Sequence, residues 1–296
     1  MIRTLILGFL GGLLAAGSLR AQTFLAPGTP LYRHRDLTAE HLFSVNIEGP
    51  AFRHDTLFVV NYLHDGTIGY VLPGGRCGLY LNLPEGSTGN SLKFDARGWM
   101  YVADFTGHNV LLVSPSKKVS AFCHEPRFSQ PNDICMAPRG RIYASDPDWK
   151  DSTGAVWLVT RGHARLLVHM GTANGIELSP DNRTLYVNES DQRKIWTFRV
   201  APDGSLSHKT LFASFPDYGL DGMHCDKAGH LYVCRYGKGQ LDEFTPAGRL
   251  LRRIPLKGRN CSNFVFGDRD GRTVFVTLQD RKCVEMFRVA VPGKGY

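Results

Sequence analysis

After its first 21 residues, the chain has no apolar run of the roughly 20 residues that a membrane-spanning helix needs. It also lacks a lysine and arginine block interleaved with aromatic side chains, although its formal charge is +8. We therefore expect a solvated basic surface and no nucleic-acid partner. There is no GxSxG motif, so no nucleophilic serine arrangement is indicated.

Cysteine is also scarce, with 7 in 296 residues and no CxxC pair. This number is too low and too dispersed for a disulfide scaffold or a structural zinc site, and an odd count leaves at least one thiol unpaired. The only close pair, Cys225 and Cys234, flanks one predicted hairpin. A disulfide bond between these two cysteines is possible, but two buried apolar thiols are favoured.

The first residues do contain a short apolar run. Residues 1 to 21 combine a basic Arg3, an apolar stretch from Leu5 to Gly17 and small residues around Ala21, the pattern of a cleavable signal peptide. We expect a secreted or periplasmic protein whose mature chain has no membrane span and a formal charge of +6. An uncleaved membrane anchor is the alternative, but the apolar run is short for one.

The rest of the chain is a repeat. Six copies share an apolar strand, a tight turn and a second strand built around an aromatic residue, as in "LKFDARGWMYVADF" and "MHCDKAGHLYVCRY". The aromatic residues recur every 42 to 46 positions, at Phe58, Tyr101, Tyr143, Tyr186, Tyr232 and Phe275. A period in the forties, made of short strands without helical segments, is typical of a β-propeller blade.

Each copy continues into a third and a fourth strand, except the last, which ends after its third. We therefore predict an all-β, six-bladed β-propeller with four-stranded blades. We expect residues 41 to 47, "HLFSVNI", to supply the missing outer strand and close the ring. The domains would be a signal peptide (1–21), a leader (22–40) and one propeller (41–296). An open two-sheet sandwich is the alternative, but it would not need a regular period.

A polar residue recurs at the start of each first strand. Counting back from the aromatic residues gives positions 42 to 47 residues apart: Glu48, Asn90, Asn132, Asn174, Asp221 and Asn263. The first strand of a propeller blade lies beside the central channel, so these six side chains should meet at one mouth. For Asn90 and Asn263, capping of a loop explains the recurrence equally well.

Four of these positions predict a metal site. Two carboxylates and two amide carbonyls, from Glu48, Asn132, Asn174 and Asp221, form an all-oxygen set for one divalent cation. Without His or Cys the set favours Ca²⁺, with Mg²⁺, Mn²⁺ or Zn²⁺ as alternatives.

The motifs "IEGPAF", "QPNDICMAPRGRIYASDP", "ANGIELSPDNRTLYV" and "LDGMHCDKAGHLYV" resemble those of the senescence marker protein, gluconolactonase and luciferin-regenerating enzyme family. The likeness covers the chain from about residue 40. It implies that Glu48, Asn174 and Asp221 bind one divalent metal, and that Asn132 contacts substrate or completes the metal shell. Sugar-lactone members often have Arg where this chain has Gln130, which brings aldonolactone specificity into question.

We therefore expect metal-assisted hydrolysis of a small-molecule lactone, of the gluconolactonase type, with the oligomeric state left open. Asp221 would accept the proton of the attacking water and Asn132 would orient the carbonyl. The residues expected to contact substrate are Asn132, Asn90, Gln130, Asp104, Asp146 and Arg235. The alternatives are a non-catalytic secreted propeller that binds a sugar or envelope ligand, and a metal-dependent aryl esterase or phosphotriesterase.

Overall fold

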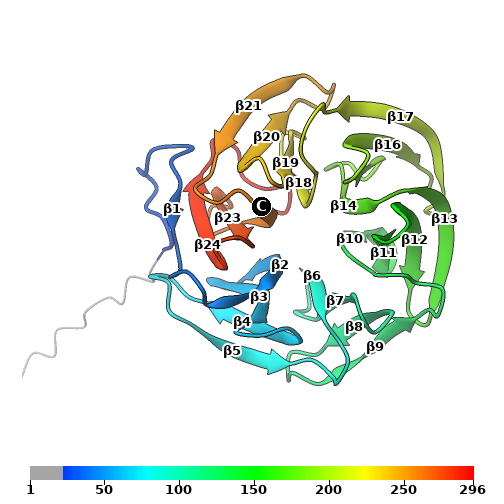
Figure 1. Ribbon diagram of the computed structural model, residues 1–296, viewed down its shortest axis with the longest axis horizontal. Coiled ribbons are helices and arrows are strands. Elements are labelled where there is room, and N and C mark those ends of the chain that lie inside the picture. The colour runs from blue at the N-terminus through cyan, green and yellow to red at the C-terminus, as the bar shows by residue number, and fades with distance from the viewer. Residues whose placement is uncertain (1–22) are drawn as a thin grey trace, which may run out of the picture.

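The computed structural model describes residues 23–296, so the predicted signal peptide lies outside the described residues. The regular secondary structure of the described chain is almost wholly β-strand. Its strands form six four-stranded sheets, and its one helix is the 3₁₀ turn η1 (Pro138–Gly140). The sheets stand around a ring with their first strands near the centre (Figure 1). The predicted six-bladed β-propeller is confirmed.

In each of the first three blades, antiparallel strands follow chain order from the centre outward. Blade one consists of β2 (Phe43–Arg53), β3 (Thr56–Tyr62), β4 (Thr67–Val71) and β5 (Cys77–Asn82). Blade two consists of β6 (Gly89–Phe94), β7 (Met100–Asp104), β8 (Asn109–Val113) and β9 (Val119–His124). Blade three consists of β10 (Ile134–Ala137), β11 (Arg141–Asp148), β12 (Thr153–Thr160) and β13 (His163–Gly171).

The next two blades repeat this order, and the last takes its outer strand from the other end of the chain. Blade four consists of β14 (Ala173–Leu178), β15 (Thr184–Glu189), β16 (Lys194–Val200) and β17 (Leu206–Ser214). Blade five consists of β18 (Met223–Cys225), β19 (Leu231–Arg235), β20 (Gln240–Phe244) and β21 (Leu250–Pro255). Blade six consists of β22 (Cys261–Gly267), β23 (Thr273–Leu278), β24 (Cys283–Arg288) and β1 (Arg35–Asp36).

The strand β1 closes the ring. It pairs antiparallel with β24, and Arg35 lies opposite Met286. The backbone N–H of Leu37 prolongs the contact by donating to the carbonyl oxygen of Val284 at 2.9 Å. The backbone groups of β24 are thereby paired on both sides, which protects a sheet edge that would otherwise invite association. Closure by an N-terminal outer strand is confirmed.

The segment that closes the ring lies earlier than we predicted. Residues 43 to 47 belong to β2, where Phe43 lies opposite Tyr62 and Ile47 is fully buried, so the assignment of residues 41 to 47 to the outer strand was wrong. An alternating apolar pattern suits an inner or an outer strand equally, and only the partner edge decides between them. Residues 35 and 36, which we placed in the leader, are therefore part of a blade.

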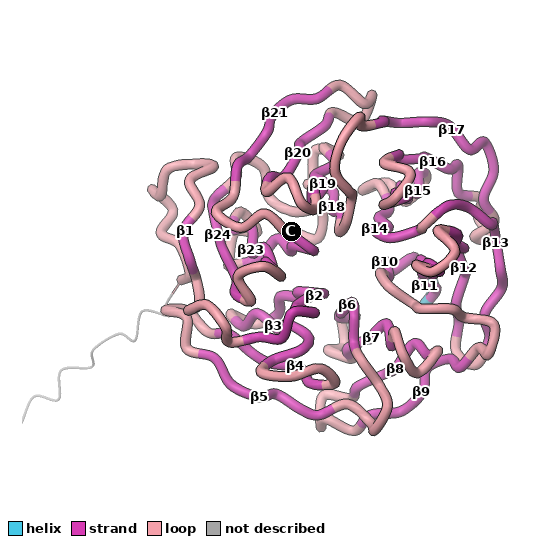
Figure 2. The backbone as a smooth tube through the Cα atoms, in the orientation of Figure 1, coloured by secondary structure: helices cyan, strands magenta, loops and turns pink. Residues whose placement is uncertain are grey.

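Apolar side chains fill the spaces between neighbouring blades. Between blades five and six, the buried cluster includes Tyr232, Phe264, Val276 and Phe287, each at 0% exposure. The recurring aromatic of the second strand thus packs against the next blade. Burial of such side chains stabilises the fold by about 1.5–3 kcal/mol each. The repeat is maintained by this packing, which holds the first strands beside the central axis (Figure 2).

All seven cysteines lie in the described residues, and none forms a disulfide. Cys225 and Cys234 are buried free thiols, as expected. Within residues 23–296, no helix combines the length and apolarity needed to cross a membrane.

Candidate metal and active site

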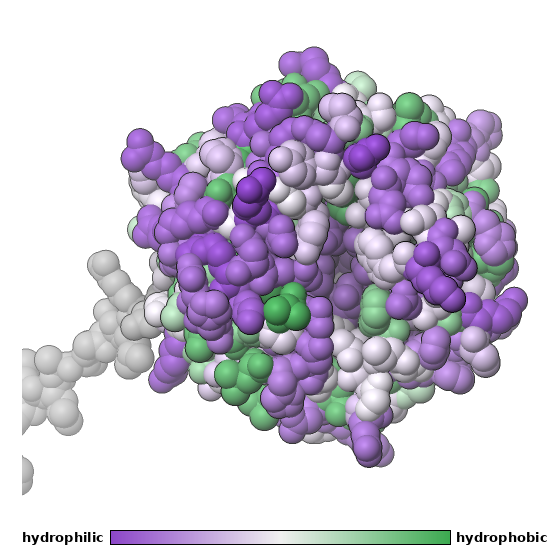
Figure 3. Space-filling model, in the orientation of Figure 1, coloured by the Kyte–Doolittle hydropathy of each residue, from purple (hydrophilic) through white to green (hydrophobic). Residues whose placement is uncertain are grey.

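The six recurring polar residues come together at one end of the central channel, because each lies on an innermost strand or just before one. Five of them are buried and Asn90 is half-buried, and the buried five are Glu48, Asn132, Asn174, Asp221 and Asn263. The molecular surface is hollowed at the middle of the ring, among mainly hydrophilic residues (Figure 3).

Glu48 has two other members of this group as close neighbours. The side chains of Asn263 and Asp221 lie near enough to it to lower its pKa. Asn174 likewise lies near Asp221 and lowers the pKa of that carboxyl. Blades one, four, five and six therefore each contribute one member to a continuous polar cluster. The sequence analysis left Asn263 out of the site, although its position in the repeat was visible.

A glycine follows three of these residues and makes room for the next blade. A Cβ atom on Gly222 would lie 2.2 Å from the side-chain carbon Cγ of Asn263, and one on Gly175 would lie 2.3 Å from the carbonyl oxygen of Asp221. A Cβ on Gly49 would lie 2.5 Å from a backbone oxygen of blade two. The Asp221-Gly222 pair is therefore not a turn but a close approach between blades five and six.

Burial disfavours the charged form of both carboxylates. Burial raises the pKa of Glu48 to about 8, against smaller lowering effects from its hydrogen-bond donors. Burial, followed by the charge of Glu48, raises the pKa of Asp221 well above its usual value of 3.8. Two buried acids in contact retain both charges only if positive charge is supplied nearby. A cation between them would do so.

The amide at blade four points to the same conclusion. Among the described residues, Asn174 Oδ1 is one of the few buried polar atoms without a hydrogen-bond partner. A buried carbonyl oxygen left without a donor costs free energy, unless a water or a cation satisfies it. Two carboxylates and an unsatisfied amide oxygen in one cluster fit a hard divalent cation.

The comparisons with known proteins agree with the architecture. The model of the SMP-30/gluconolactonase/LRE-like region matches residues 48–280, which is most of the chain. The chain belongs to this family.

The curated relatives of the chain are family members of modest identity. A gluconolactonase of Zymomonas mobilis is 30% identical over 216 residues, covering 64% of this chain and 60% of the relative. A lactonase drp35 of Staphylococcus saprophyticus is 26% identical over 172 residues, covering 56% and 41%. The matched region thus spans about half the length of these relatives.

Solved structures show the same fold. The calcium-binding protein regucalcin of Agrobacterium tumefaciens aligns with a TM-score of 0.77 at 20% identity, covering 90% of this chain and 96% of that one. A gluconolactonase of Xanthomonas campestris aligns with a TM-score of 0.74 at 23% identity, covering 88% and 90%.

Asn132 and Asn90 belong to the six recurring residues and stand on blades three and two. Asn132 is 5% exposed. Its backbone carbonyl oxygen accepts a hydrogen bond from Nδ2 of Asn90 at 3.3 Å. Gln130 is half-buried in the loop before β10, where its Oε1 accepts from the backbone N–H of Trp149 at 3.3 Å. The Asn90 contact supports the loop-capping interpretation of that residue.

The other predicted substrate contacts have structural partners. Asp104 is fully buried, and its two oxygens accept hydrogen bonds from Ser87, Asn109 and two backbone N–H groups. Asp146 accepts from the backbone N–H groups of Ser129 and Gln130 and from Trp157. Both carboxylates therefore hold loops in place, which accounts for their recurrence at the end of the second strand.

Arg235 has a comparable structural role. It is 2% exposed and pairs with Asp242 and with Asp217, at 2.9 Å each. Its guanidinium also lies 3.9 Å from the ring centroid of Phe215. The structure thus gives Asp104, Asp146 and Arg235 structural explanations and does not join them to the carboxylate cluster.

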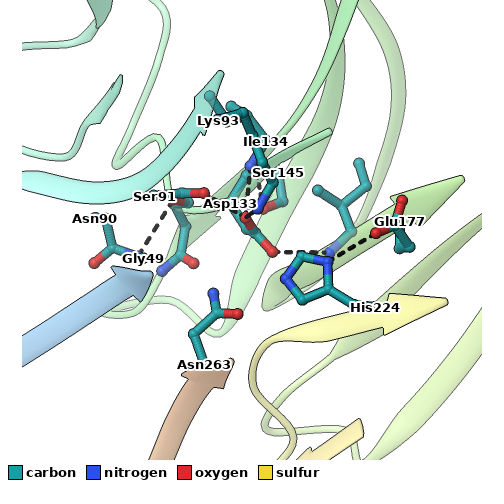
Figure 4. A network of polar contacts seen from close by, with 12 residues as sticks. Gly49, Asn90, Ser91, Lys93, Asp133, Ile134, Ser145, Glu177, His224 and Asn263 are labelled. Carbon is teal, nitrogen blue, oxygen red and sulfur yellow. Dashed lines mark hydrogen bonds and ion pairs between the residues drawn. The ribbon is translucent and has the colours of Figure 1, made fainter. Parts of the chain in front are cut away.

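Below the cluster, the channel contains charged residues that the sequence analysis missed. Asp133 is fully buried and accepts from Ser91 Oγ at 2.6 Å and from the backbone N–H of Ile134 at 2.8 Å (Figure 4). Further along, His224 Nδ1 lies 2.7 Å from Glu177 Oε2. Asp133 directly follows Asn132 in the "PND" motif, and this was the one available signal.

The opposite mouth of the channel is lined by the chain terminus. A cavity of about 420 Å³ there has Phe52, Phe94, Met136 and Glu177 among its walls, together with residues 293 to 296. Lys294 pairs with Glu177 and donates to the carbonyl oxygen of Leu178 at 2.8 Å. The C-terminal segment therefore lies against the channel from the side opposite Asp221.

Proposed function

We propose that the chain is a divalent-metal-dependent lactonase that opens the ring of a sugar lactone of the gluconolactonase type. The observation that carries the proposal is the buried cluster of Glu48, Asp221 and Asn174, whose amide oxygen has no partner in the described structure. These are the residues to which the family resemblance assigns the metal. They lack nitrogen and sulfur donors, so Ca²⁺ is the first choice, followed by Mg²⁺ and Mn²⁺, with Zn²⁺ least suited.

The relatives support the chemistry. Among them are a gluconolactonase, several lactonases and a pentonolactonase of Haloferax volcanii, which is 26% identical over 151 residues. All three names describe proteins that act on lactones, and the family model matches residues 48–280, which include the cluster. Because the match covers only part of each relative, we assign a lactonase activity to this chain only as a proposal.

A bound divalent cation would polarise the ester carbonyl and lower the pKa of a water at the site. Glu48, Asn174 and Asp221 would hold it through oxygen atoms. The side chain of Asn132, next to the cluster on blade three, would donate to the lactone carbonyl oxygen and orient it.

Asp221 would act as the general base. It accepts a proton from the water as the water oxygen attacks the carbonyl carbon, and the ring C–O bond then breaks. The proton passes to the leaving alkoxide oxygen, so the product is an open-chain hydroxy acid. The buried position of Asp221 keeps this transfer out of bulk water.

The experiment is metal analysis combined with turnover. The purified protein is assayed on a panel of aldonolactones, aryl esters and phosphotriesters before and after chelation, and then after addition of Ca²⁺, Mg²⁺, Mn²⁺ or Zn²⁺. We expect at least one bound ion per chain, loss of lactone turnover on chelation and recovery with at least one of the added ions. Protein that never turns over lactones with any ion would contradict the proposal, and turnover of another ester class alone would redirect it.

The variant Asp221→Asn separates an enzyme from a binding protein. It keeps the size of the side chain but cannot accept a proton, so we expect a loss of turnover of 10²-fold or more with the fold retained. As a matched control, Asp280→Asn changes a carboxylate that accepts only backbone N–H groups, from Arg259 and Asn260. A non-catalytic sugar-binding propeller would keep its ligand affinity in both variants.

We further propose that residues 1 to 21 direct export to the periplasm or the medium. The supporting pattern is the basic start, the apolar stretch and the small residues near Ala21. Mass spectrometry of the protein recovered from each cell fraction tests this. A chain with its first residues intact in the cytoplasm would contradict it.

A further inference from the structure

A second cluster of possible metal ligands lies on blade five, away from the channel mouth that holds Asp221. Asp226, His230 and Glu243 each offer one atom, and these three atoms lie within 4.8 Å of one another. Asp226 and His230 stand at the tip of the β18–β19 hairpin, at the other end of β18 from Asp221, and Glu243 lies on β20 (Figure 1).

Strand register places these side chains on one face of the blade. Tyr232 lies directly opposite Glu243 in the β19–β20 ladder, and His230 precedes Tyr232 by two residues. Residues two apart on a strand, and residues directly opposite across a ladder, point to the same side. This face packs against blade six, where Tyr232 contacts the ring of Phe266 at 5.4 Å between centroids.

The local turn explains only part of the cluster. Asp226 Oδ1 accepts from the backbone N–H groups of Ala228 and His230, at 2.9 and 2.8 Å. Asp95 makes the equivalent turn in blade two, where Trp99 stands in place of His230. The turn therefore requires the aspartate and one of its oxygens. It requires neither the histidine nor the glutamate.

An independent observation points to a ligand. Tyr232 is 0% exposed, and its hydroxyl is among the buried polar atoms of the described residues that have no partner. The tyrosine at the same position of blade three, Tyr143, donates its hydroxyl to the carbonyl oxygen of Gly204 at 2.9 Å. Tyr232 lies opposite Glu243 in the β19–β20 ladder, so the two side chains share one face of the blade.

The two separations measured from His230 lie on either side of the value for a tetrahedral ion. Bonds of about 2.0–2.1 Å to nitrogen and oxygen place tetrahedral ligand atoms about 3.3 Å apart. Asp226 Oδ2 lies 2.8 Å from His230 Nδ1, which lies 3.8 Å from Glu243 Oε1. The other oxygen of Glu243 accepts from Arg252 Nε at 3.1 Å, the kind of outer partner that orients a ligating carboxylate.

We propose that Asp226, His230 and Glu243 bind a transition-metal cation of the Zn²⁺ class, with the Tyr232 hydroxyl as the fourth group. One imidazole nitrogen among oxygens favours Zn²⁺ over Ca²⁺, in contrast to the all-oxygen cluster at the channel. The ion would join the hairpin tip to the third strand of blade five. The bound ion would stabilise the fold. The proposed ion site does not depend on the proposed lactonase activity.

The test uses the full chain with the channel cluster disabled by Glu48→Gln and Asp221→Asn. This background is stripped with a chelator and titrated with Co²⁺, whose visible absorption reports four-coordinate nitrogen and oxygen sites. We expect one Co²⁺ per chain at micromolar affinity. Zn²⁺ should displace it and raise the melting temperature by a few degrees.

Three additional variants in this background locate the ion. His230→Asn keeps a donor for Asp226 but loses the imidazole, and Glu243→Gln keeps the side-chain size. Each should weaken Co²⁺ binding at least 100-fold and abolish the Zn²⁺-dependent rise in melting temperature. The matched control His169→Asn changes an exposed histidine on β13 and should bind as the background does.

Two outcomes would overturn the proposal. One is a background protein that binds no Co²⁺ at millimolar concentration. The other is equal Co²⁺ affinity in the His230→Asn and His169→Asn variants, since binding would then lie elsewhere. Circular dichroism of each apo variant before titration shows that any loss of binding occurs in folded protein.

Discussion

At the scale of single residues, the chemistry of Asp221 depends on its neighbours. The Asp-Gly pair would be turn material in isolation. In the folded chain, Asp221 contacts Glu48 and Asn174, and Gly222 provides the space that Asn263 fills. The function of this residue pair comes from the approach of other blades, which the local sequence does not contain.

Replacement of Gly222 by alanine should therefore damage the site. The added Cβ would lie 2.2 Å from Asn263 Cγ, so the Asn263 side chain or the strands of blades five and six must shift. We expect a loss of stability of about 1–3 kcal/mol, as for overpacked cores, and a metal affinity reduced at least tenfold. Thermal unfolding and metal titration measure both effects.

Gly219→Ala is the matched control, because its Cβ would meet no atom closer than 3.3 Å. If both alanine variants bind metal like the parent protein, the close approach at Gly222 does not position the ligand.

At the scale of elements, two chain ends determine how the ring is finished. The strand β1 covers the outer edge of β24. The C-terminal residues 293 to 296 line the channel mouth opposite Asp221. Neither segment follows the blade repeat. Both act through a few polar contacts, such as those of Arg281 with Asp36 at 2.7 Å and of Lys294 with Glu177.

A chain that begins at residue 41 should show the role of β1. Such a truncation keeps all of blade one but uncovers β24, whose unpaired backbone groups can then pair with another chain. We expect a lower melting temperature and association that increases with protein concentration, measured by thermal unfolding and light scattering. A chain that begins at residue 23 is the control. Equal behaviour of the two chains would show that β1 is dispensable.

The C-terminal ion pair predicts a pH-dependent stability. Burial alone would raise the pKa of Glu177, but Lys294 and His224 together lower it from 4.5 to about 2. A carboxyl with a lowered folded-state pKa contributes stability that is complete above pH 4.5 and is lost as the pH falls toward 2. Lys294→Met should therefore cost about 3 kcal/mol near neutral pH, and less in acid.

Urea unfolding of Lys294→Met and the parent protein between pH 2.5 and 7 measures this difference. Lys227→Met, at an exposed position without an ion pair among the described residues, is the control and should show no such trend. A difference for Lys294→Met that is constant across this range would disprove the proposed pairing with Glu177.

At the scale of the whole molecule, the proposed channel metal would join distant parts of the chain. Its ligands come from blade one, blade four and blade five, in a ring whose first and last blades are already linked by β1. A cation that binds only the folded state stabilises all of these blades together, by about 2.7 kcal/mol at 100 times its Kd.

Chelation should accordingly lower the melting temperature of the entire ring by a few degrees in one cooperative transition. Calorimetry of the metal-loaded and chelated protein measures the shift. In a His230→Asn background, which removes the proposed blade-five site, Asp221→Asn should abolish or much reduce the shift, whereas Asp280→Asn should retain it. A chelator-dependent shift that persists unchanged in Asp221→Asn would place the stabilising ion elsewhere.

The sequence by itself determined the architecture and most of the candidate cluster. A period of 42 to 46 residues with a recurring aromatic requires blades, because each copy must bury the same apolar face against its neighbour. The same period identified Glu48, Asn174 and Asp221, since equivalent positions in a ring of strands meet at one mouth.

Only the tertiary structure decided which polar residues face the channel and which support loops. Asp104, Asp146 and Arg235 were predicted to contact substrate, yet their hydrogen bonds hold loops or neighbouring strands. The choice of β1 as the closing strand and the place of Lys294 beside Glu177 were equally invisible. A repeat fixes positions within a blade, but contacts between blades and chain ends depend on which side chains meet across space.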